Sequence, residues 1–291
     1  MDFKNGQELL HLCRENHLKI SEVMKHREIS SGSLTEEEVD AKMKTVLSIM
    51  KDAVNEPLMR PKRSIGGLIG GEAKKVSDFG RTSSSICGTL MSKAIAYSMA
   101  VLEVNASMGL IVAAPTAGSS GVLPGVLLAV QEEKQLTDEH LYAGLLNASA
   151  IGYLLMRNAS VSGAEAGCQA EVGAASAMAA SAVVEMMGGT PEMSLQAAGI
   201  AISNLLGMVC DPIAGLVEAP CQSRNSIGSA NAVICAELAL AGVTHPIPFD
   251  EMVEAMYRVG KSIPFELRET AMGGCAGTPT GCALGCHICT K

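Results

Sequence analysis

The feature that most constrains this chain is an interior of small and aliphatic residues with almost no aromatic ones. Hydrophobic residues fill 48% of the 291 positions, whereas aromatic residues fill only 3% and Trp is absent. Glycine, alanine and methionine are abundant instead. Small side chains allow helices to approach closely, because the distance between helix axes depends on the side chains at the contact. The composition therefore favours a tightly packed helical interior over an aromatic-rich sandwich of sheets.

The apolar pattern is helical along nearly the whole chain. Thr35 and Glu38 form a capping-box pattern, and Pro57 is expected to end the helix that they open. There is no strand-like alternation of useful length and no internal repeat. We predict an all-α, compact multi-helix domain with helices at about 6–16, 21–29, 36–55, 85–107, 122–134, 138–157, 168–187, 191–209, 226–241 and 250–259.

One stretch is the best candidate for a domain boundary. Residues 60–71 begin with the basic run Arg-Pro-Lys-Arg and continue with two glycine pairs, so we expect a loop there. It would separate a short N-terminal helical arm, residues 1–60, from a catalytic body, residues 61–291. The two parts can also form one continuous domain, since a prior of roughly 150 residues per domain allows either division.

Charge and hydropathy exclude two classes of protein. The formal net charge of −8 lacks the basic footprint of a nucleic-acid-binding protein. The longest uncharged stretch, Val104–Gln131, is interrupted by Pro115, Pro124 and several glycines, so we do not expect it to span a membrane. The first residues show no apolar signal segment, and we expect a cytoplasmic protein.

Three of the ten cysteines stand at predicted helix ends or in loops rich in Gly and Pro: Cys168, Cys210 and Cys221. Disulfides are not expected in a reducing compartment. Thiolate ligands favour such places, because exposed backbone N–H groups stabilise negative sulfur. The separations of 42 and 11 residues match no short zinc or ferredoxin pattern. Spacing alone therefore leaves open a metal site and three ordinary buried thiols.

The surroundings of these cysteines carry more information than their spacing. The segments are GCQAEVG at 167–173, CDPIAGLVEAPC at 210–221 and AAPTAGSSG at 113–121. EVNASMG at 103–109 and RETAMGG at 268–274 add to them. Together, over nearly the whole chain, they resemble the α chain of the iron–sulfur-dependent L-serine dehydratases.

The resemblance implies a cofactor and a reaction. In that family three cysteines hold a [4Fe–4S] cluster, and their motif positions fall here on Cys168, Cys210 and Cys221. The fourth iron would then act as a Lewis acid on the hydroxyl of L-serine, giving pyruvate and ammonia without pyridoxal phosphate. Two alternatives stay open: a cysteine-desulfurating lyase on the same scaffold, and a non-catalytic metal-binding helical protein.

The resemblance also implies a partner. Single-chain relatives carry a Ser-Ser-Ser-His-Thr motif in their other domain, and this chain lacks it. We therefore expect a β subunit to complete the active enzyme.

Two groups of residues are candidates for binding the substrate carboxylate. Thr116, Gly118, Ser119, Ser120 and Gly121 lie in a loop before a predicted helix and offer hydroxyl groups and close backbone approach. Read alone, that loop is equally a simple connector. Beyond the loop, Arg224 could pair with a carboxylate in two-pronged fashion or form a structural ion pair.

Glu171 and the C-terminal cysteines are further candidates. Glu171 follows Cys168 by three residues, which places both on one helical face. It is a candidate base, or else an acidic residue that favours a helix N-terminus. Cys282, Cys286 and Cys289 could supply a resting-state ligand, form a second metal site or belong to a diverged end, and the sequence favours none of these.

Overall fold

The computed structural model describes residues 1–32 and 34–289 and confirms the predicted all-α fold. Its described residues contain no strand, only an isolated bridge between Cys210 and Arg268. Four short helical turns are η1 (Ala117–Ser119), η2 (Gln169–Gly173), η3 (Ile213–Gly215) and η4 (Phe265–Leu267). The helices are α1 (Gly6–Asn16), α2 (Ile20–Gly32), α3 (Glu36–Met59), α4 (Glu72–Gly80), α5 (Gly88–Ala106), α6 (Val122–Lys134), α7 (Asp138–Asn158), α8 (Gly163–Ala166), α9 (Ala174–Met186), α10 (Pro191–Asn204), α11 (Cys221–Leu240), α12 (Phe249–Ser262) and α13 (Pro279–Cys289).

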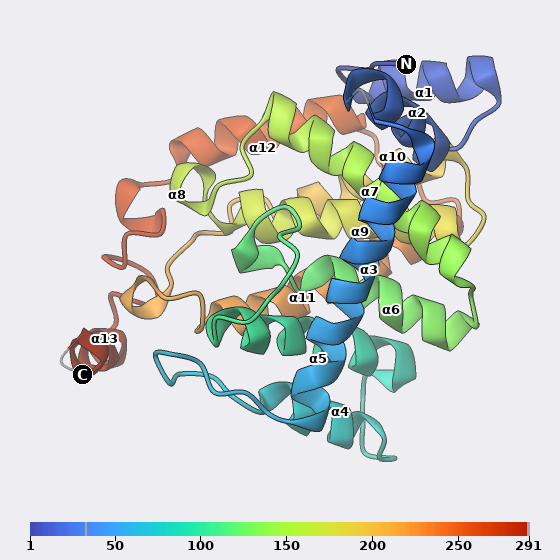
Figure 1. The fold of residues 1–291 in the computed structure, drawn as a ribbon. Helices are drawn as coiled ribbons and strands as arrows, with labels where there is room; N and C mark the ends of the chain where they lie inside the picture. The colour runs from blue at the N-terminus through green and yellow to red at the C-terminus, as the bar shows by residue number, and fades with distance from the viewer. Residues whose placement is uncertain (33, 290–291) are drawn as a thin grey trace.

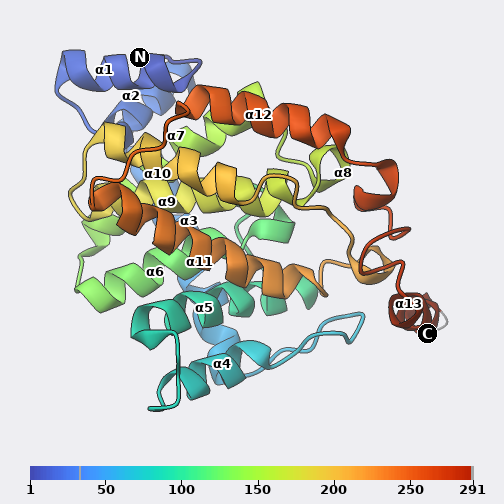
Figure 2. The same ribbon diagram turned by 180° about the vertical axis from the view of Figure 1, so that it is seen from behind.

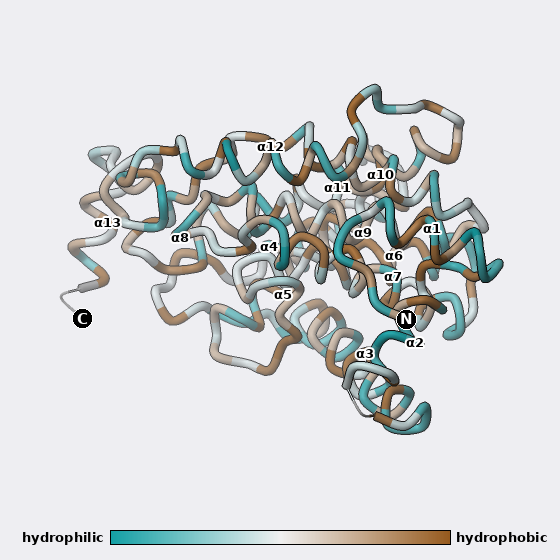
Figure 3. Tube along the Cα trace, turned by 90° about the horizontal axis from the view of Figure 1, so that it is seen from above, coloured by the Kyte–Doolittle hydropathy of each residue, from teal (hydrophilic) through white to brown (hydrophobic). Residues whose placement is uncertain are grey.

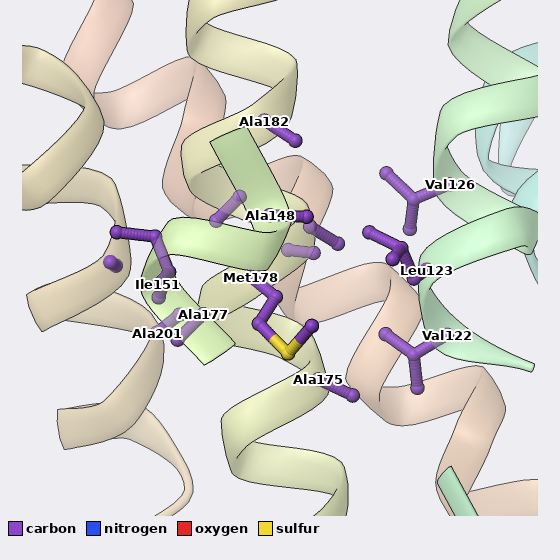
Figure 4. Packing of buried hydrophobic residues seen from close by; sticks show 14 of the residues in the cluster. Val122, Leu123, Val126, Ala148, Ile151, Ala175, Ala177, Met178, Ala182 and Ala201 are labelled. Carbon is purple, nitrogen blue, oxygen red and sulfur yellow. The ribbon is translucent and has the colours of Figure 1, made fainter. Parts of the chain in front are cut away.

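Helix α9 is the centre of the molecule. All of its residues are buried, and most of them are Ala, Ser or Val. Helices α6, α7, α10 and α11 pack around it (Figure 1). In the close view, Met178 of α9 lies among Ala148 and Ile151 on one side and Val122 and Leu123 on the other (Figure 4). The small side chains of α9 allow four helices to approach it at once, as the composition predicts.

The other helices form an outer layer. Helix α5 packs on α6 and α11, and α4 covers α5. The long helix α3 crosses the front of the molecule diagonally, while α12 covers α10 on the back (Figures 1 and 2). Hydrophilic residues recur along α1, α2 and α12 at the outside, as Figure 3 shows. Helix α13 lies at the end away from the N-terminus and packs against η3.

Several predicted helix boundaries are wrong. Helix α3 does not end at Pro57 but continues to Met59, since a proline in the last turn removes only one helical hydrogen bond and its ring is buried. Helix α11 begins at Cys221, five residues before the predicted start. Helix α10 ends at Asn204 rather than at Val209, because the chain turns at Gly207 with φ of +81°.

Three helices, α4, α8 and α13, were not predicted, whereas residues 60–71 form the predicted loop between α3 and α4. Among the described helices, none has the length and apolar character needed to cross a membrane.

Candidate functional site

Cys168, Cys210 and Cys221 come from three separate elements and lie close enough for their charges to interact. Cys168 directly precedes η2, Cys210 lies in the loop after α10, and Cys221 is the first residue of α11. Their exposed fractions are 4%, 3% and 8%. Burial, and then the charge of Glu171, raises the pKa of the Cys168 thiol to about 12. Burial, and then the nearby charges of Glu171 and Cys168, raises the pKa of Cys210. The pKa of Cys221 is raised by burial and then by the charge of Cys168.

The turn that carries Cys168 is fixed by the loop that leads to Cys210. The backbone N–H of Gln169 donates to the Met208 carbonyl at 3.0 Å, and the Gln169 side chain accepts from the Gly207 N–H at 2.9 Å. Gly167 adopts a φ of +74°, and a Cβ there would lie 2.7 Å from the Met208 carbonyl oxygen. The following π-helical turn, η2, is of a kind that recurs at functional sites. These contacts hold two of the three thiols relative to each other.

Cys210 is anchored on its other side by the segment after α12. Its N–H donates to the Leu267 carbonyl at 2.9 Å, and its carbonyl accepts from the Glu269 N–H at 2.6 Å. These paired bonds form the isolated bridge noted above. They fix the backbone of Cys210 in a loop that has little regular structure.

Glu171 lies between the thiols and the loop at 115–121. Its Oε1 accepts a hydrogen bond from Thr116 Oγ1 at 2.7 Å, and its Oε2 is 3.8 Å from Cys210 Sγ. A Cβ on Gly118 would lie 3.1 Å from the same carboxylate, so the loop backbone comes close to it. Burial raises the pKa of the Glu171 carboxyl group, although the bond from Thr116 opposes this. The structure thus places a half-buried carboxyl group against one of the three thiols.

The remaining loop residues point into the loop itself. Ser120 Oγ donates to the Ala117 carbonyl at 2.7 Å, and Ser119 Oγ lies 3.1 Å from Thr116 Oγ1. Asn225, to which the sequence analysis gave no role, ties the loop to α11. Its side chain donates to the Gly118 carbonyl at 2.8 Å and accepts from the Gly121 N–H at 3.1 Å. Of the predicted substrate loop, Thr116 and Gly118 therefore face Glu171, while Ser119, Ser120 and Gly121 shape the loop.

Arg224 is held in place by protein groups. Its Nη1 is 2.6 Å from Asp211 Oδ1 and donates to the Val209 carbonyl at 2.8 Å. The second carboxylate oxygen of Asp211 accepts from the Cys275 N–H at 2.5 Å. The positive charge of Arg224 acts on Cys168 and lowers the pKa of that thiol, against the effect of burial. Of the two roles considered for Arg224, these contacts favour the structural ion pair over binding of the substrate carboxylate.

The three thiols have the chemistry of ligands to an iron–sulfur cluster. Burial first, and then the nearby negative charges, raise the pKa values of the three thiols, and a positively charged metal centre would favour their thiolate forms instead. Soft thiolate ligands suit iron–sulfur clusters. Within residues 1–32 and 34–289, no three His, Cys, Asp or Glu side chains converge as they would on a single ion. A polynuclear cluster has no need for such convergence on a single point, because each of its thiolates binds a separate iron.

The C-terminal cysteines are distant in sequence from Cys210 and Cys221, but the helix that carries them lies near the segment between those two residues. Helix α13 packs against η3, and Cys282 and Cys286 are exposed on it. Cys282 Sγ lies 3.5 Å from the Ala276 carbonyl oxygen. The side chain of Cys289 is outside the described part of the chain.

Comparison with known proteins identifies the family. The profile described as "Serine dehydratase alpha chain" matches residues 15–276. The probable L-serine dehydratase alpha chain of Bacillus subtilis (strain 168) is 48% identical, over 96% of this chain and 93% of that protein. The L-serine dehydratase alpha chain of Peptoniphilus asaccharolyticus is 46% identical, over 95% and 94%.

A longer relative is matched in part. L-serine dehydratase TdcG of Escherichia coli (strain K12) is 35% identical, over 94% of this chain but only 62% of that protein. Profile and relatives agree over nearly the full length, and the chain belongs to the serine dehydratase alpha chain family, a family of lyases.

Proposed function

We propose that this chain is the catalytic subunit of an L-serine dehydratase, which converts L-serine to pyruvate and ammonia. Two relatives at 46–48% identity are named as alpha chains of that enzyme, one of them as a probable one. The observation that carries the proposal is the set of three buried thiols around Glu171, which lies within the family match. The three thiols lie close enough for their charges to interact, and a metal centre would stabilise the thiolate forms that burial disfavours.

We propose further that Cys168, Cys210 and Cys221 hold a [4Fe–4S] cluster, and that the reaction uses no pyridoxal phosphate. When bound, such a cluster supplies an open iron as a Lewis acid for the substrate hydroxyl. The donor set supports this, because all three ligands are thiols and come from separate, well-anchored elements.

In this proposal Glu171 is the base. Its carboxylate lies beside Cys210 and would take the proton from the α carbon of serine. The electron pair of that C–H bond forms the Cα–Cβ double bond while the Cβ–O bond breaks, and the leaving hydroxide takes up the proton that Glu171 has removed and departs as water. The resulting aminoacrylate tautomerises to an imine, which water hydrolyses to pyruvate and ammonia.

Thr116 and the loop have two tasks here. The 2.7 Å bond from Thr116 Oγ1 orients the Glu171 carboxylate. The Thr116 hydroxyl has a single proton and gives it to Glu171, so we assign the nearby loop backbone at Gly118 to the substrate carboxylate. Ser119, Ser120, Gly121 and Asn225 would keep the loop in that shape.

We also propose a β subunit and a cytoplasmic location. The chain covers 93–94% of two relatives named as alpha chains but 62% of the longer Escherichia coli relative. A second chain would supply what the longer protein carries in one polypeptide. The buried free thiols are suited to a reducing compartment.

The test is anaerobic turnover by the iron-loaded chain, alone and with a candidate β chain. Pyruvate release should require L-serine and increase when the β chain is added, with slower turnover of L-threonine and L-cysteine. Faster release of sulfide from L-cysteine than of ammonia from L-serine would instead support the desulfurating lyase. An iron-loaded pair without lyase activity on any of the three amino acids would refute the catalytic proposal.

A further inference from the structure

A buried carboxylate in the Cys210–Cys221 segment is gripped by the loop before α4. Glu218, three residues before Cys221, has an exposed fraction of 2%. Its Oε1 accepts from the Gly66 N–H at 2.7 Å, and its Oε2 accepts from the Leu68 N–H at 2.9 Å and from Ser64 Oγ at 2.6 Å. The two partners of this contact are about 150 residues apart in the chain.

The loop is shaped to receive this side chain. Ser64 Oγ also accepts from the N–H groups of Gly67 at 3.1 Å and Ile69 at 3.2 Å, which closes the loop around it. A Cβ on Gly66 would lie 2.7 Å from Glu218 Oε1, so a larger residue there would collide with the carboxylate. Successive N–H groups that point into one concavity form an anion-binding nest.

A second buried carboxylate, Glu103, contacts both the start of α4 and the residue that follows Cys221. Glu103 on α5 is fully buried, and its Oε1 accepts from the Ala73 N–H at 3.0 Å. The same oxygen accepts from the side chain of Gln222 at 3.2 Å. Gln222 directly follows Cys221, and its N–H donates to the Glu218 carbonyl at 2.9 Å.

The segment between Cys210 and Cys221 has little regular secondary structure of its own. Between Cys210 and Cys221 the only helical turn is η3, which contains Ala214 at a φ of +57°. Residues 64–73 therefore contact the chain directly at Glu218, before Cys221, and share the Glu103 carboxylate with Gln222, after Cys221.

We propose that residues 64–73 act as a clamp that positions the Cys221 thiol, with Glu218 and Ser64 as positioning residues. The role toward a metal cluster rests on the proposed function, since it requires Cys221 to be a ligand. The effect on the thiol itself does not, because the clamp acts on the backbone that carries Cys221.

The experiment measures thiol reactivity in the full-length, metal-free, reduced chain. Each variant is treated with iodoacetamide, and alkylation of Cys221 and of Cys168 is followed by peptide mass spectrometry. Cys168 is the internal reference, because it lies on a different element. The variants are Glu218→Gln, which places an N–H group where an acceptor is needed, and Ser64→Ala, which removes the hydroxyl that donates to Glu218 and accepts from the N–H groups of Gly67 and Ile69. The control is Glu185→Gln, the same chemical change at a buried carboxyl group on α9.

We expect Cys221 in Glu218→Gln to react about tenfold faster than in the wild type, as a locally opened segment does. Ser64→Ala should give a smaller increase, with Cys168 unchanged in both variants and both thiols unchanged in Glu185→Gln. An unchanged Cys221 rate, or equal acceleration at Cys168 and Cys221, would overturn the clamp. If Glu218→Gln does not fold, Ser64→Ala decides alone.

A second readout separates the clamp from the proposed function. Iron release to a chelator from the reconstituted chain should be about tenfold faster in Glu218→Gln than in the wild type or in Glu185→Gln. A wild-type chain that never takes up iron would refute the cluster while the alkylation rates still decide on the clamp.

Discussion

At the scale of single residues, buried carboxyl groups hold together parts of the chain that are far apart in sequence. Glu185 on α9 is an example outside the thiol site. Its Oε2 accepts from the Asn147 side chain at 2.7 Å and from the Ser21 N–H at 3.3 Å. Asn147 in turn accepts from Ser181 at 2.6 Å. A single carboxyl group thereby joins α2, α7 and α9 in the interior.

The pH dependence of stability should reveal the cost of burying Glu185. Burial raises the pKa of its carboxyl group above the ordinary 4.5, so the folded chain keeps a proton that the unfolded chain releases. The stabilisation is therefore complete below pH 4.5 and is lost as the pH rises through the folded pKa. The side chain of Glu185→Gln does not titrate, so this variant should not lose that stability as the pH rises. The difference in unfolding free energy between variant and wild type should grow with pH by at most about 1.4 kcal/mol per pH unit.

Urea denaturation between pH 4.5 and 8 measures this difference, with Glu37→Gln on the exposed start of α3 as the control. Parallel pH profiles for Glu185→Gln and wild type would contradict the account of Glu185.

Glu171→Gln tests the proposed base. The amide keeps the shape of the carboxyl group and can accept the bond from Thr116, but it cannot take a proton. We expect kcat for L-serine to fall by about 10²- to 10⁴-fold, with iron content unchanged. Thr116→Val should lower kcat less, because it only releases the orientation of Glu171. A Glu171→Gln chain with wild-type kcat would reduce Glu171 to an anchor for the 115–121 loop.

At the scale of elements, glycines set how closely helices pack. Some of these glycines lie against backbone atoms of the next helix, and others lie against a flexible side chain. A Cβ on Gly125 of α6 would lie 2.8 Å from the Ser98 backbone nitrogen and 3.0 Å from the Ala94 carbonyl oxygen of α5. A Cβ on Gly152 of α7 would lie 3.0 Å from the end of the Met178 side chain. Backbone atoms cannot move aside without shifting a helix, whereas a methionine side chain can adopt another rotamer.

The pair of variants Gly125→Ala and Gly152→Ala should therefore differ in stability. We expect Gly125→Ala to destabilise the chain by about 1–3 kcal/mol through overpacking. Gly152→Ala should be close to neutral, since the better helix propensity of alanine, up to about 1 kcal/mol, offsets the repacking of Met178. Urea denaturation of both variants checks this, and equal losses would contradict the packing described for α5 and α6.

Elements with local signals were predictable, and those set by distant contacts were not. Asn5, Thr35 and Thr190 each accept a hydrogen bond from the first turn of their helix, and those three helix starts follow from the sequence. The end of α10 does not, because the apolar run continues while the Gly207 N–H bonds to Gln169 on another element. Helix α4 buries only Ala73 and so lacks a clear apolar stripe.

The candidate site follows the same rule. Cys168, Cys210 and Cys221 were chosen through the surrounding motifs, because their spacing matches no local ligand pattern. Glu171 was predictable as a neighbour of Cys168 through helical spacing, but its contacts with Thr116 and Cys210 come from other elements. The grip on Glu218 has no local sequence signal at all, since its donors lie in a loop about 150 residues earlier.

At the scale of the whole molecule, the thiols lie where several long-range connections meet. Cys168 leads into central α9, Cys221 begins α11, and Cys210 is joined to the segment after α12. Figures 1 and 2 place α8, α13 and the tip of the loop before α4 on the same side of the molecule, away from α1 and α2. The all-helical core thus serves as a scaffold for one site at one end.

The measurement that tests this account most directly is anaerobic iron and sulfide quantitation on the wild type and on Cys168→Ala, Cys210→Ala and Cys221→Ala. Cys235→Ala is the matched control, because Cys235 is also fully buried but lies within α11, next to Asn204 and Asn231. We predict about four irons per chain in the wild type and in Cys235→Ala, and loss of iron in each of the other three variants. Full iron content in all three variants would contradict the assignment of these cysteines as the ligands.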